Sequence, residues 1–136
     1  MVASILIVED HEKVRKALRN LLEARFSHFQ VIEASSAEEA IDLTLSEAPY
    51  LIIMDISLPG MNGIEATRKV RAIPSPPRVV IFTIHEDDIY REEARDAGAT
   101  AYVAKHALQS ELMPKLLALL PADKKIDLSE NINTYQ

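Results

Sequence analysis

Residues 50–63 read YLIIMDISLPGMNG, and this stretch decides the fold class. Its first five residues form an apolar run without the polar alternation of a strand that has one face in water. Short, uniformly apolar runs are typical of parallel strands that are buried on both faces. The run stops at Asp55, and the proline–glycine and asparagine–glycine pairs that follow predict a loop. The stretch therefore predicts a buried parallel strand that ends in a carboxylate.

Four further apolar runs flank this strand, and helical patterns separate all five. The runs lie at 4–8, 29–34, 78–83 and 101–104. Apolar residues recur at helical spacing in the intervals, for example Val14, Ala17, Leu18, Leu21 and Leu22 in a helix over 11–26. Further helices are expected over 37–48, 63–72, 86–97 and 108–120. Helical crossovers between parallel strands place helices on both faces, so the sequence predicts a doubly wound α/β fold around a five-stranded parallel sheet.

Three local signals refine the helix ends. Ser35 or Ser36 is the expected N-cap of the second helix, because a serine hydroxyl can accept a bond from a free amide of the first turn. Gly98 follows the fourth helix at the position where a left-handed conformation is common. Pro114 lies inside the last helical pattern and lacks a backbone donor, which predicts a kink or a late helix start.

Composition limits the classes of protein that remain. The chain has 136 residues, 48% of them hydrophobic, which fits one domain over 1–120 followed by a polar tail or linker over 121–136. It has no cysteine, so disulfides and thiolate metal sites are excluded. A net charge of −6 argues against nucleic-acid binding by this domain. The sequence shows no signal peptide and no run long enough to span a membrane, so we expect a cytoplasmic protein.

Reactive side chains follow the apolar runs where each run ends. They are Glu9, Asp10, Asp55, Thr83 and Lys105. Ligands of open α/β sheets bind beyond the carboxyl ends of the strands, so these groups are expected to converge. Three carboxylates there would repel one another, and Mg²⁺ would relieve the repulsion and favour phosphoryl chemistry at one of them. Each residue alone also has a structural explanation, such as helix capping by Asp10 or a turn at Asp55.

Three histidines are expected near the same edge, at His11, His85 and His106. They suggest a transition-metal site as an alternative. No histidine pair has the spacing of a metal motif, and solvated loop positions are the better explanation.

The segments ILIVED, LIIMDISLPGMNGIE, VVIFT and GATAYVAK resemble, in order, the receiver domain of two-component response regulators. The similarity extends from about residue 4 to 120. It implies a flavodoxin-like sheet with strand order 2-1-3-4-5. It also implies that a sensor histidine kinase or a phosphotransfer protein donates a phosphoryl group to this chain.

The resemblance assigns a role to each matching position. Asp55 would be the phosphoacceptor, and Glu9, Asp10, Asp55 and the backbone carbonyl of Ser57 would hold Mg²⁺, with Glu9 acting largely through water. Thr83 would be the switch hydroxyl, Lys105 the phosphoryl-binding amine and Tyr102 the aromatic side chain whose rotamer reports phosphorylation. A partly buried strand aromatic is the other interpretation of Tyr102.

Three positions depart from the family pattern. Glu9 is longer than the usual aspartate but keeps its charge. His106 replaces the usual proline after the lysine, so the Lys105–His106 peptide is expected to be trans. Ile84 replaces a small residue after the switch threonine, beside Ser57 and His85, and is expected to hinder water and slow the hydrolysis of the phosphorylated form.

The segment HEDDIYREEARDAGATAYVAK is most similar to receivers that precede a LuxR-type helix-turn-helix domain. No such domain fits after residue 120, so a stand-alone receiver and a truncated chain both remain open. The expected output surface is the face of the fourth helix, fifth strand and fifth helix, which could also mediate self-association. An aspartate-nucleophile phosphatase is the competing class, but Ser57 stands where its general acid would be. A receiver that is never phosphorylated is the third option.

Overall fold

The computed structural model describes residues 2–120, and it contains five strands and five α-helices in alternation. The strands are β1 (Ser4–Val8), β2 (Gln30–Ala34), β3 (Leu51–Met54), β4 (Arg78–Thr83) and β5 (Ala101–Ala104). The α-helices are α1 (Glu12–Arg25), α2 (Ala37–Glu47), α3 (Gly63–Arg71), α4 (Asp88–Asp96) and α5 (Met113–Leu119). The five elements predicted as strands therefore exist within one residue of the expected bounds. The proposed tail over 121–136 lies outside the described residues and remains a prediction.

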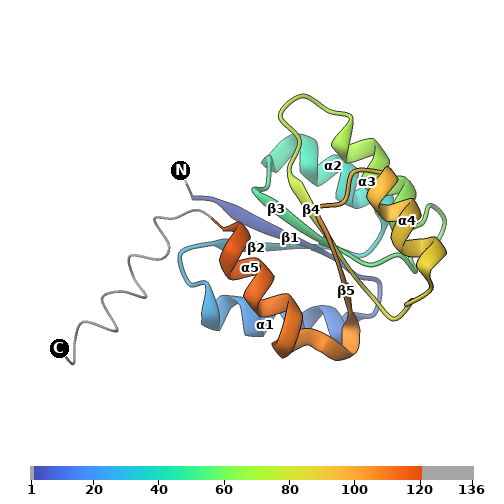
Figure 1. The fold of residues 1–136 in the computed structure, drawn as a ribbon. Helices are drawn as coiled ribbons and strands as arrows, with labels where there is room; N and C mark the ends of the chain where they lie inside the picture. The colour runs from blue at the N-terminus through green and yellow to red at the C-terminus, as the bar shows by residue number, and fades with distance from the viewer. Residues whose placement is uncertain (1, 121–136) are drawn as a thin grey trace.

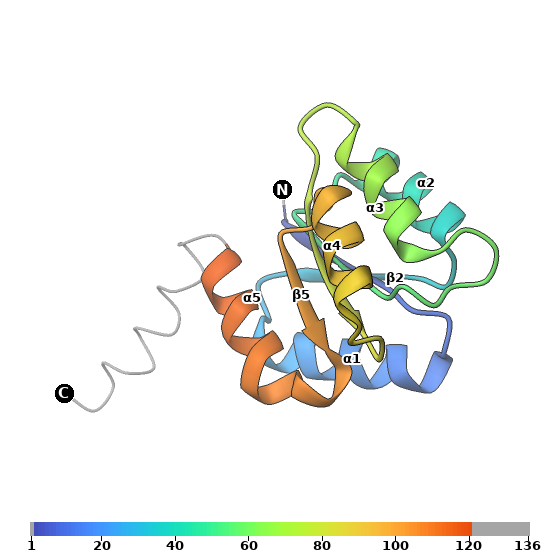
Figure 2. The same cartoon turned by 45° about the vertical axis from the view of Figure 1, so that its right-hand side comes forward.

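All neighbouring strands pair in parallel, in the order β2-β1-β3-β4-β5. Helices α1 and α5 cover one face of the sheet, and α2, α3 and α4 cover the other (Figures 1 and 2). This is the doubly wound, flavodoxin-like arrangement that the sequence predicted. The carboxyl ends of β1, β3, β4 and β5 consequently share one edge.

The core has two parts, one on each face of the sheet. In β1, Ile5 and Ile7 pack with Leu22 of α1 and Leu116 of α5 on one face. Leu6 and Val8 pack among residues of α2 and α3 on the other. Every residue of β1 and β3 is buried, which explains why these strands show no polar alternation.

Two helical faces are narrower than the sequence pattern suggested. In α1, Leu18 and Leu22 are buried as predicted, but Val14 is 38% exposed and Ala17 is also exposed. In α2, Leu45 is 64% exposed. Helical spacing places apolar residues on one side of a helix, but it does not show how far the sheet extends beneath them. Val14 instead lines the cavity at the carboxyl edge.

The chain after β5 forms a continuous run of tighter and wider helical turns. A 3₁₀ turn covers Lys105–Ala107, a π-helical segment covers Leu108–Leu112, and α5 begins only at Met113. Pro114 therefore occupies the first turn of α5, as a late start required. No cis peptide bond is present in residues 2–120, so the Lys105–His106 peptide is trans as predicted. Ser36 is the N-cap of α2, and Gly98 has a φ of 105° after α4.

Candidate functional site

The predicted reactive groups meet at the carboxyl edge of the sheet. A cavity of about 340 Å³ opens there between the loops that follow β1, β3 and β4 and the end of β5. Its lining consists of Asp10, His11, Val14, Asp55, Ser57, Ile84 and Lys105. Topology explains the convergence, because the residues come from positions up to 95 apart in sequence, from Asp10 to Lys105. The reactive side chains predicted at separate strand ends therefore line one concave site.

Lys105 lies between two buried carboxylates. Its Nζ atom is 2.6 Å from Oε1 of Glu9 and 3.0 Å from Oδ2 of Asp55. Glu9 and Asp55 are each only 4% exposed. Burial by itself disfavours the lysine ammonium, but the hydrogen bonds to Glu9 and Asp55 outweigh it, and the pKa of Lys105 is raised above its usual value. A permanent positive charge therefore faces Asp55.

Glu9, Asp10 and Asp55 form an acidic group that could hold a metal ion. Each offers a carboxylate oxygen, and these oxygens lie within 4.8 Å of one another. The Glu9 carboxylate also accepts a bond from the backbone amide of His11 at 3.1 Å, and Asp55 accepts one from the amide of Ser57 at 3.4 Å. Oxygen-only carboxylate donors suit a hard divalent cation such as Mg²⁺ better than a soft transition metal.

The histidines do not join this acidic group within the described residues. The ring of His106 is exposed and contacts Glu86 at 3.3 Å. The ring of His85 contacts Ser57, and His11 contributes its backbone amide. These positions agree with solvated loop residues rather than with a transition-metal site.

The start of α3 lies directly against the backbone of Asp55. Asn62 caps the helix by accepting from the amides of Ile64 and Glu65, and the amide of Gly63 donates to the carbonyl of Ile56 at 2.9 Å. A Cβ atom on Gly63 would overlap the carbonyl oxygen of Asp55 and would lie 2.7 Å from its carbonyl carbon. Gly63 therefore fixes the path of the loop over residues 55–62, which carries Asp55.

The loop between β4 and α4 links the remaining predicted residues: Ile84 belongs to it, Thr83 ends β4 before it, and Tyr102 of β5 contacts it. Thr83 is fully buried, and its hydroxyl oxygen accepts from the amide of His85 at 3.4 Å. The Tyr102 hydroxyl donates to the carbonyl oxygen of His85 at 2.7 Å, and burial raises the pKa of Tyr102. Ile84 is 68% exposed and lines the cavity, so it does not point into the core.

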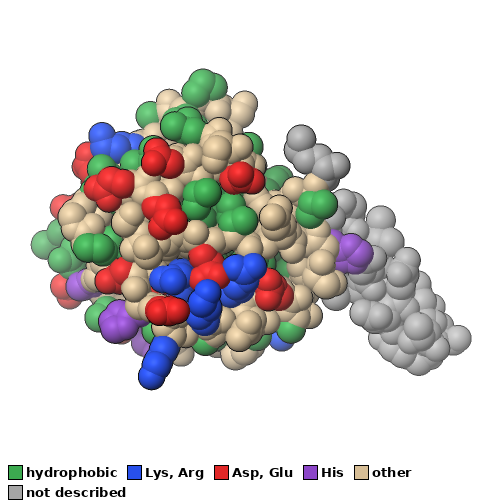
Figure 3. Space-filling view, turned by 180° about the vertical axis from the view of Figure 1, so that it is seen from behind, with side chains coloured by type: hydrophobic (Ala, Val, Ile, Leu, Met, Phe, Trp, Pro, Cys, Tyr) green, Lys and Arg blue, Asp and Glu red, His purple; other side chains and the backbone are tan. Residues whose placement is uncertain are grey.

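A group of ion pairs between α1 and β2 contacts the backbone of Glu9 and was not predicted from the sequence. Arg15 donates to the backbone carbonyl of Glu9 at 2.8 Å and to Glu33 of β2 at 2.7 Å. Lys16 and Arg19 also contact Glu33. Basic side chains gather around acidic ones on this face of the molecule (Figure 3). A charged residue, Glu33, in the interior of the short strand β2 was the signal that could have identified this group.

We expect Glu33→Gln to lower the free energy of unfolding by about 1–2 kcal/mol at pH 7. Burial would raise the pKa of Glu33, but hydrogen bonds from Arg19, Arg15 and Lys16 lower it from 4.5 to about 2. Because the folded pKa is the lower one, this stabilisation is present above pH 4.5 and is lost as the pH falls towards 2. Urea unfolding of both proteins between pH 7 and pH 3 measures the difference.

Glu23→Gln is the matched control, since Glu23 pairs with Arg19 among residues 2–120 and is about half exposed. It should change stability by less than about 0.5 kcal/mol. A Glu33→Gln difference that stays constant over this pH range would contradict the assigned pKa of Glu33.

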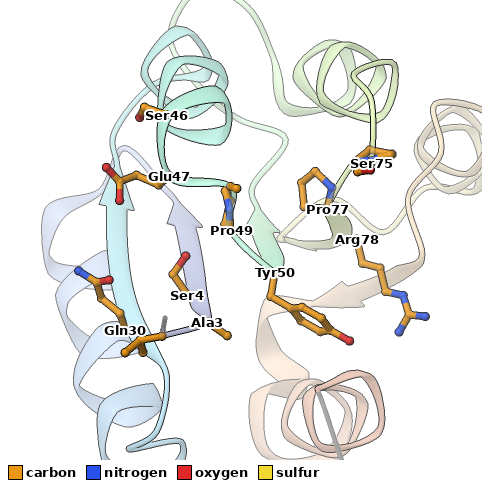
Figure 4. A pocket seen from close by; sticks show the side chains of 13 residues that line it. Ala3, Ser4, Gln30, Ser46, Glu47, Pro49, Tyr50, Ser75, Pro77 and Arg78 are labelled. Atoms are coloured by element: carbon orange, nitrogen blue, oxygen red, sulfur yellow. The ribbon is translucent and has the colours of Figure 1, made fainter.

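A second cavity, of about 840 Å³, lies at the opposite edge of the sheet (Figure 4). It is lined by the amino ends of strands and by the chain that follows α2 and α3, including Ser4, Gln30, Tyr50 and Arg78. None of the predicted site residues lines it. Size therefore does not identify the reactive site here, and the grouping of charged side chains does.

Comparison with known proteins agrees with this geometry. A family model described as "Response regulator receiver domain" matches residues 5–117. The chain is 31% identical over 123 residues to the response regulator UvrY of Escherichia coli (strain K12), which covers 90% of this chain and 56% of that protein. It is 34% identical over 116 residues to the nitrate/nitrite response regulator protein NarL of the same strain, covering 84% and 53%. The chain thus spans about half the length of these curated relatives.

Solved structures share the fold. A two-component response regulator of the LuxR family from Aurantimonas sp. SI85-9A1 superimposes with a TM-score of 0.80 at 35% identity, covering 96% of this chain and 98% of that one. A LuxR-family DNA-binding response regulator from Staphylococcus aureus gives 0.80 at 27% identity, covering 87% and 98%. None of the helices in residues 2–120 has both the length and the apolar character of a membrane span.

Proposed function

Because the chain belongs to the response regulator receiver domain family of two-component systems, we propose that Asp55 accepts a phosphoryl group from a histidine kinase or a phosphotransfer protein. The observation that carries this proposal is the position of the Asp55 carboxylate. It lies 3.0 Å from the Lys105 ammonium, beside two further carboxylates, in an open cavity. The chain is a receiver domain rather than a typical enzyme, so the chemistry proposed is its own phosphorylation and slow dephosphorylation.

In the proposed step, an oxygen of Asp55 attacks the phosphorus atom of a phosphohistidine. The phosphorus–oxygen bond to Asp55 forms while the phosphorus–nitrogen bond breaks, and the electron pair of that bond returns to the imidazole. The ammonium of Lys105 then pairs with the negative oxygens of the phosphoryl group. Its short bond to Glu9 at 2.6 Å keeps it aimed at the cavity.

The same residues fit Mg²⁺ as a cofactor. We propose that Asp10, Asp55 and the Ser57 carbonyl hold the ion, with Glu9 acting largely through water. When bound, Mg²⁺ neutralises charge on the phosphoryl oxygens. Relief of the repulsion among three carboxylates within 4.8 Å supplies a physical reason for binding.

We propose that Thr83 and Tyr102 couple the phosphoryl group to the face formed by α4, β5 and α5. Both side chains contact His85 of the intervening loop, through its amide and its carbonyl. A change in Thr83 can therefore reach Tyr102 through one residue. This change would alter partner binding at that face, and self-association through the same face. We also propose that the protein is cytoplasmic and that this domain binds no nucleic acid.

Intact-mass spectrometry after incubation with acetyl phosphate tests the proposed function. With Mg²⁺ present, the protein should gain one phosphoryl group, and with excess chelator it should gain none. A protein that stays unlabelled in both conditions, while a known receiver is labelled in parallel, would favour the option of a receiver that is never phosphorylated.

We expect Ile84→Ala to speed the loss of the phosphoryl group by on the order of tenfold, or about 1.4 kcal/mol of barrier. Ile84 lines the cavity, and its β-branched side chain cannot easily swing away from an approaching water. Water must reach the phosphorus in line with the bond that breaks. The decay of labelled protein, followed by mass spectrometry, measures the rate.

Ile89→Ala is the matched control, because Ile89 is an equally exposed isoleucine, at 67%, that does not line the cavity. It should leave the rate unchanged. An equal or slower rate in the Ile84→Ala protein would mean that Ile84 does not restrict water, and would favour positioning of the water by His85.

A further inference from the structure

His85 connects three parts of the site through three different groups. Its backbone amide donates to the Thr83 hydroxyl at 3.4 Å, and its carbonyl accepts from the Tyr102 hydroxyl at 2.7 Å. Its ring atom Nε2 is 2.6 Å from the hydroxyl oxygen of Ser57. The same ring packs against Tyr90 of α4, with ring centroids 4.8 Å apart. Three hydroxyl side chains, those of Ser57, Thr83 and Tyr102, therefore contact one loop residue.

The contact between Ser57 and His85 joins two loops that leave different strands. Ser57 belongs to the loop after β3 that carries Asp55 (residues 55–62), which we call the acceptor loop. His85 belongs to the loop between β4 and α4 (residues 84–87). The bond is formed by side chains that are not deeply buried, and it does not involve a phosphoryl group. Its short length indicates a well-formed hydrogen bond.

Tyr102 depends on the position of the same loop. Its hydroxyl is bound to the His85 carbonyl, and the guanidinium carbon of Arg91 lies 4.6 Å from the centre of its ring. Tyr102 is therefore held against the loop and α4. If the loop moved away from Ser57, the His85 carbonyl would move with it, and the Tyr102 hydroxyl would lose its acceptor.

We propose that the hydrogen bond between Ser57 and His85 holds the loop over 84–87 against the acceptor loop, and thereby holds Tyr102 inward before any phosphoryl group is present. His85 is then a positioning residue that sets the basal balance between inward and outward Tyr102. This inference rests on the proposed function, since it concerns the regulation of the same site. A phosphoryl group on Asp55 would then shift an equilibrium in which inward Tyr102 is already favoured.

The tyrosine ring signals of unphosphorylated protein carrying ¹³C-labelled tyrosine test this inference. Loss of one signal in a Tyr102→Phe protein assigns Tyr102 among the four tyrosines of the chain. In Ser57→Ala, the Tyr102 signal should move towards the position of a solvent-exposed tyrosine. A hydrogen bond of this kind should change the ratio of inward to outward Tyr102 by about two- to tenfold.

Four further variants distinguish loss of this hydrogen bond from a general structural effect. Ser57→Thr keeps the hydroxyl and should keep the native Tyr102 signal. His85→Ala should move the signal in the same direction as Ser57→Ala, and the double variant should move it no further than the larger single change. Ser35→Ala is the control, because it removes another serine hydroxyl, bonded to Glu39, away from the loop.

The inference would be wrong if Ser57→Ala left the Tyr102 signal at its native position. It would also be wrong if the effects of Ser57→Ala and His85→Ala were additive in the double variant. Because the signals are recorded without a phosphoryl donor, they do not depend on labelling of Asp55. Failure of the proposed function would appear separately, as absence of labelling by acetyl phosphate in the native protein.

Discussion

Replacement of Asp55 by asparagine should abolish Mg²⁺-dependent labelling by acetyl phosphate. The amide of asparagine has nearly the same shape as the carboxylate, but it lacks the negative oxygen that attacks phosphorus. Mass spectrometry should find the native protein with one phosphoryl group that hydroxylamine removes, as expected of an acyl phosphate, and the variant with none. The expected loss is complete, because Glu9, the other carboxylate bonded to Lys105, is not among the residues that line the cavity.

The Asp55→Asn protein should remain folded, so the loss of labelling can be attributed to the reacting group. Lys105 keeps its 2.6 Å bond to Glu9, and one negative charge leaves a crowded acidic group. The free energy of unfolding should therefore stay within about 1 kcal/mol of the native value. Asp42→Asn, at an exposed position of α2, is the matched control and should label normally. Full labelling of the Asp55→Asn protein would assign the acceptor to another residue.

Much of the fold could be predicted because its main signals are local. Uniform apolar runs identified strands such as β1 and β3, and Pro114 identified the late start of α5. The burial of individual helix residues could not be predicted, because it depends on how far the sheet extends beneath each helix. Val14 and Leu45 match the helical pattern, but both side chains are exposed. Periodicity describes one helix and contains no information about the size of its neighbour.

The site could be predicted as a set of groups but not as a set of contacts. The ends of the apolar runs identified Asp10, Asp55 and Lys105, because the topology of the sheet brings these strand ends to its carboxyl edge. The bond between Ser57 and His85 depends on the conformation of two loops, which no spacing in the sequence determines. The contact of Arg15 with the Glu9 carbonyl likewise depends on the distance between α1 and β2. A sequence signal such as Glu33 can therefore point to a supporting residue, but its contacts follow only from the structure.

The close approach of α3 to the acceptor loop leads to the second large expected effect. Gly63→Ala should lower the free energy of unfolding by about 3 kcal/mol or more and should strongly reduce labelling of Asp55. Alanine is the better helix former by about 1 kcal/mol, which alone would stabilise α3. The added Cβ would instead overlap the Asp55 carbonyl oxygen and lie 2.9 Å from Cα of Ile56. These are backbone atoms, so the clash can be relieved only by moving the acceptor loop or the helix.

Gly60→Ala is the control that separates loss of stability from damage to the site. Gly60 has a φ of 74°, which disfavours alanine by about 1–2 kcal/mol, but its added Cβ would meet only the Glu38 carboxylate at 3.7 Å. Gly60→Ala should therefore be less stable yet label at Asp55 to the native extent. Urea unfolding and acetyl phosphate labelling of both variants measure the two effects. A Gly63→Ala protein that is as stable as the native one and labels fully would show that α3 can shift without moving Asp55.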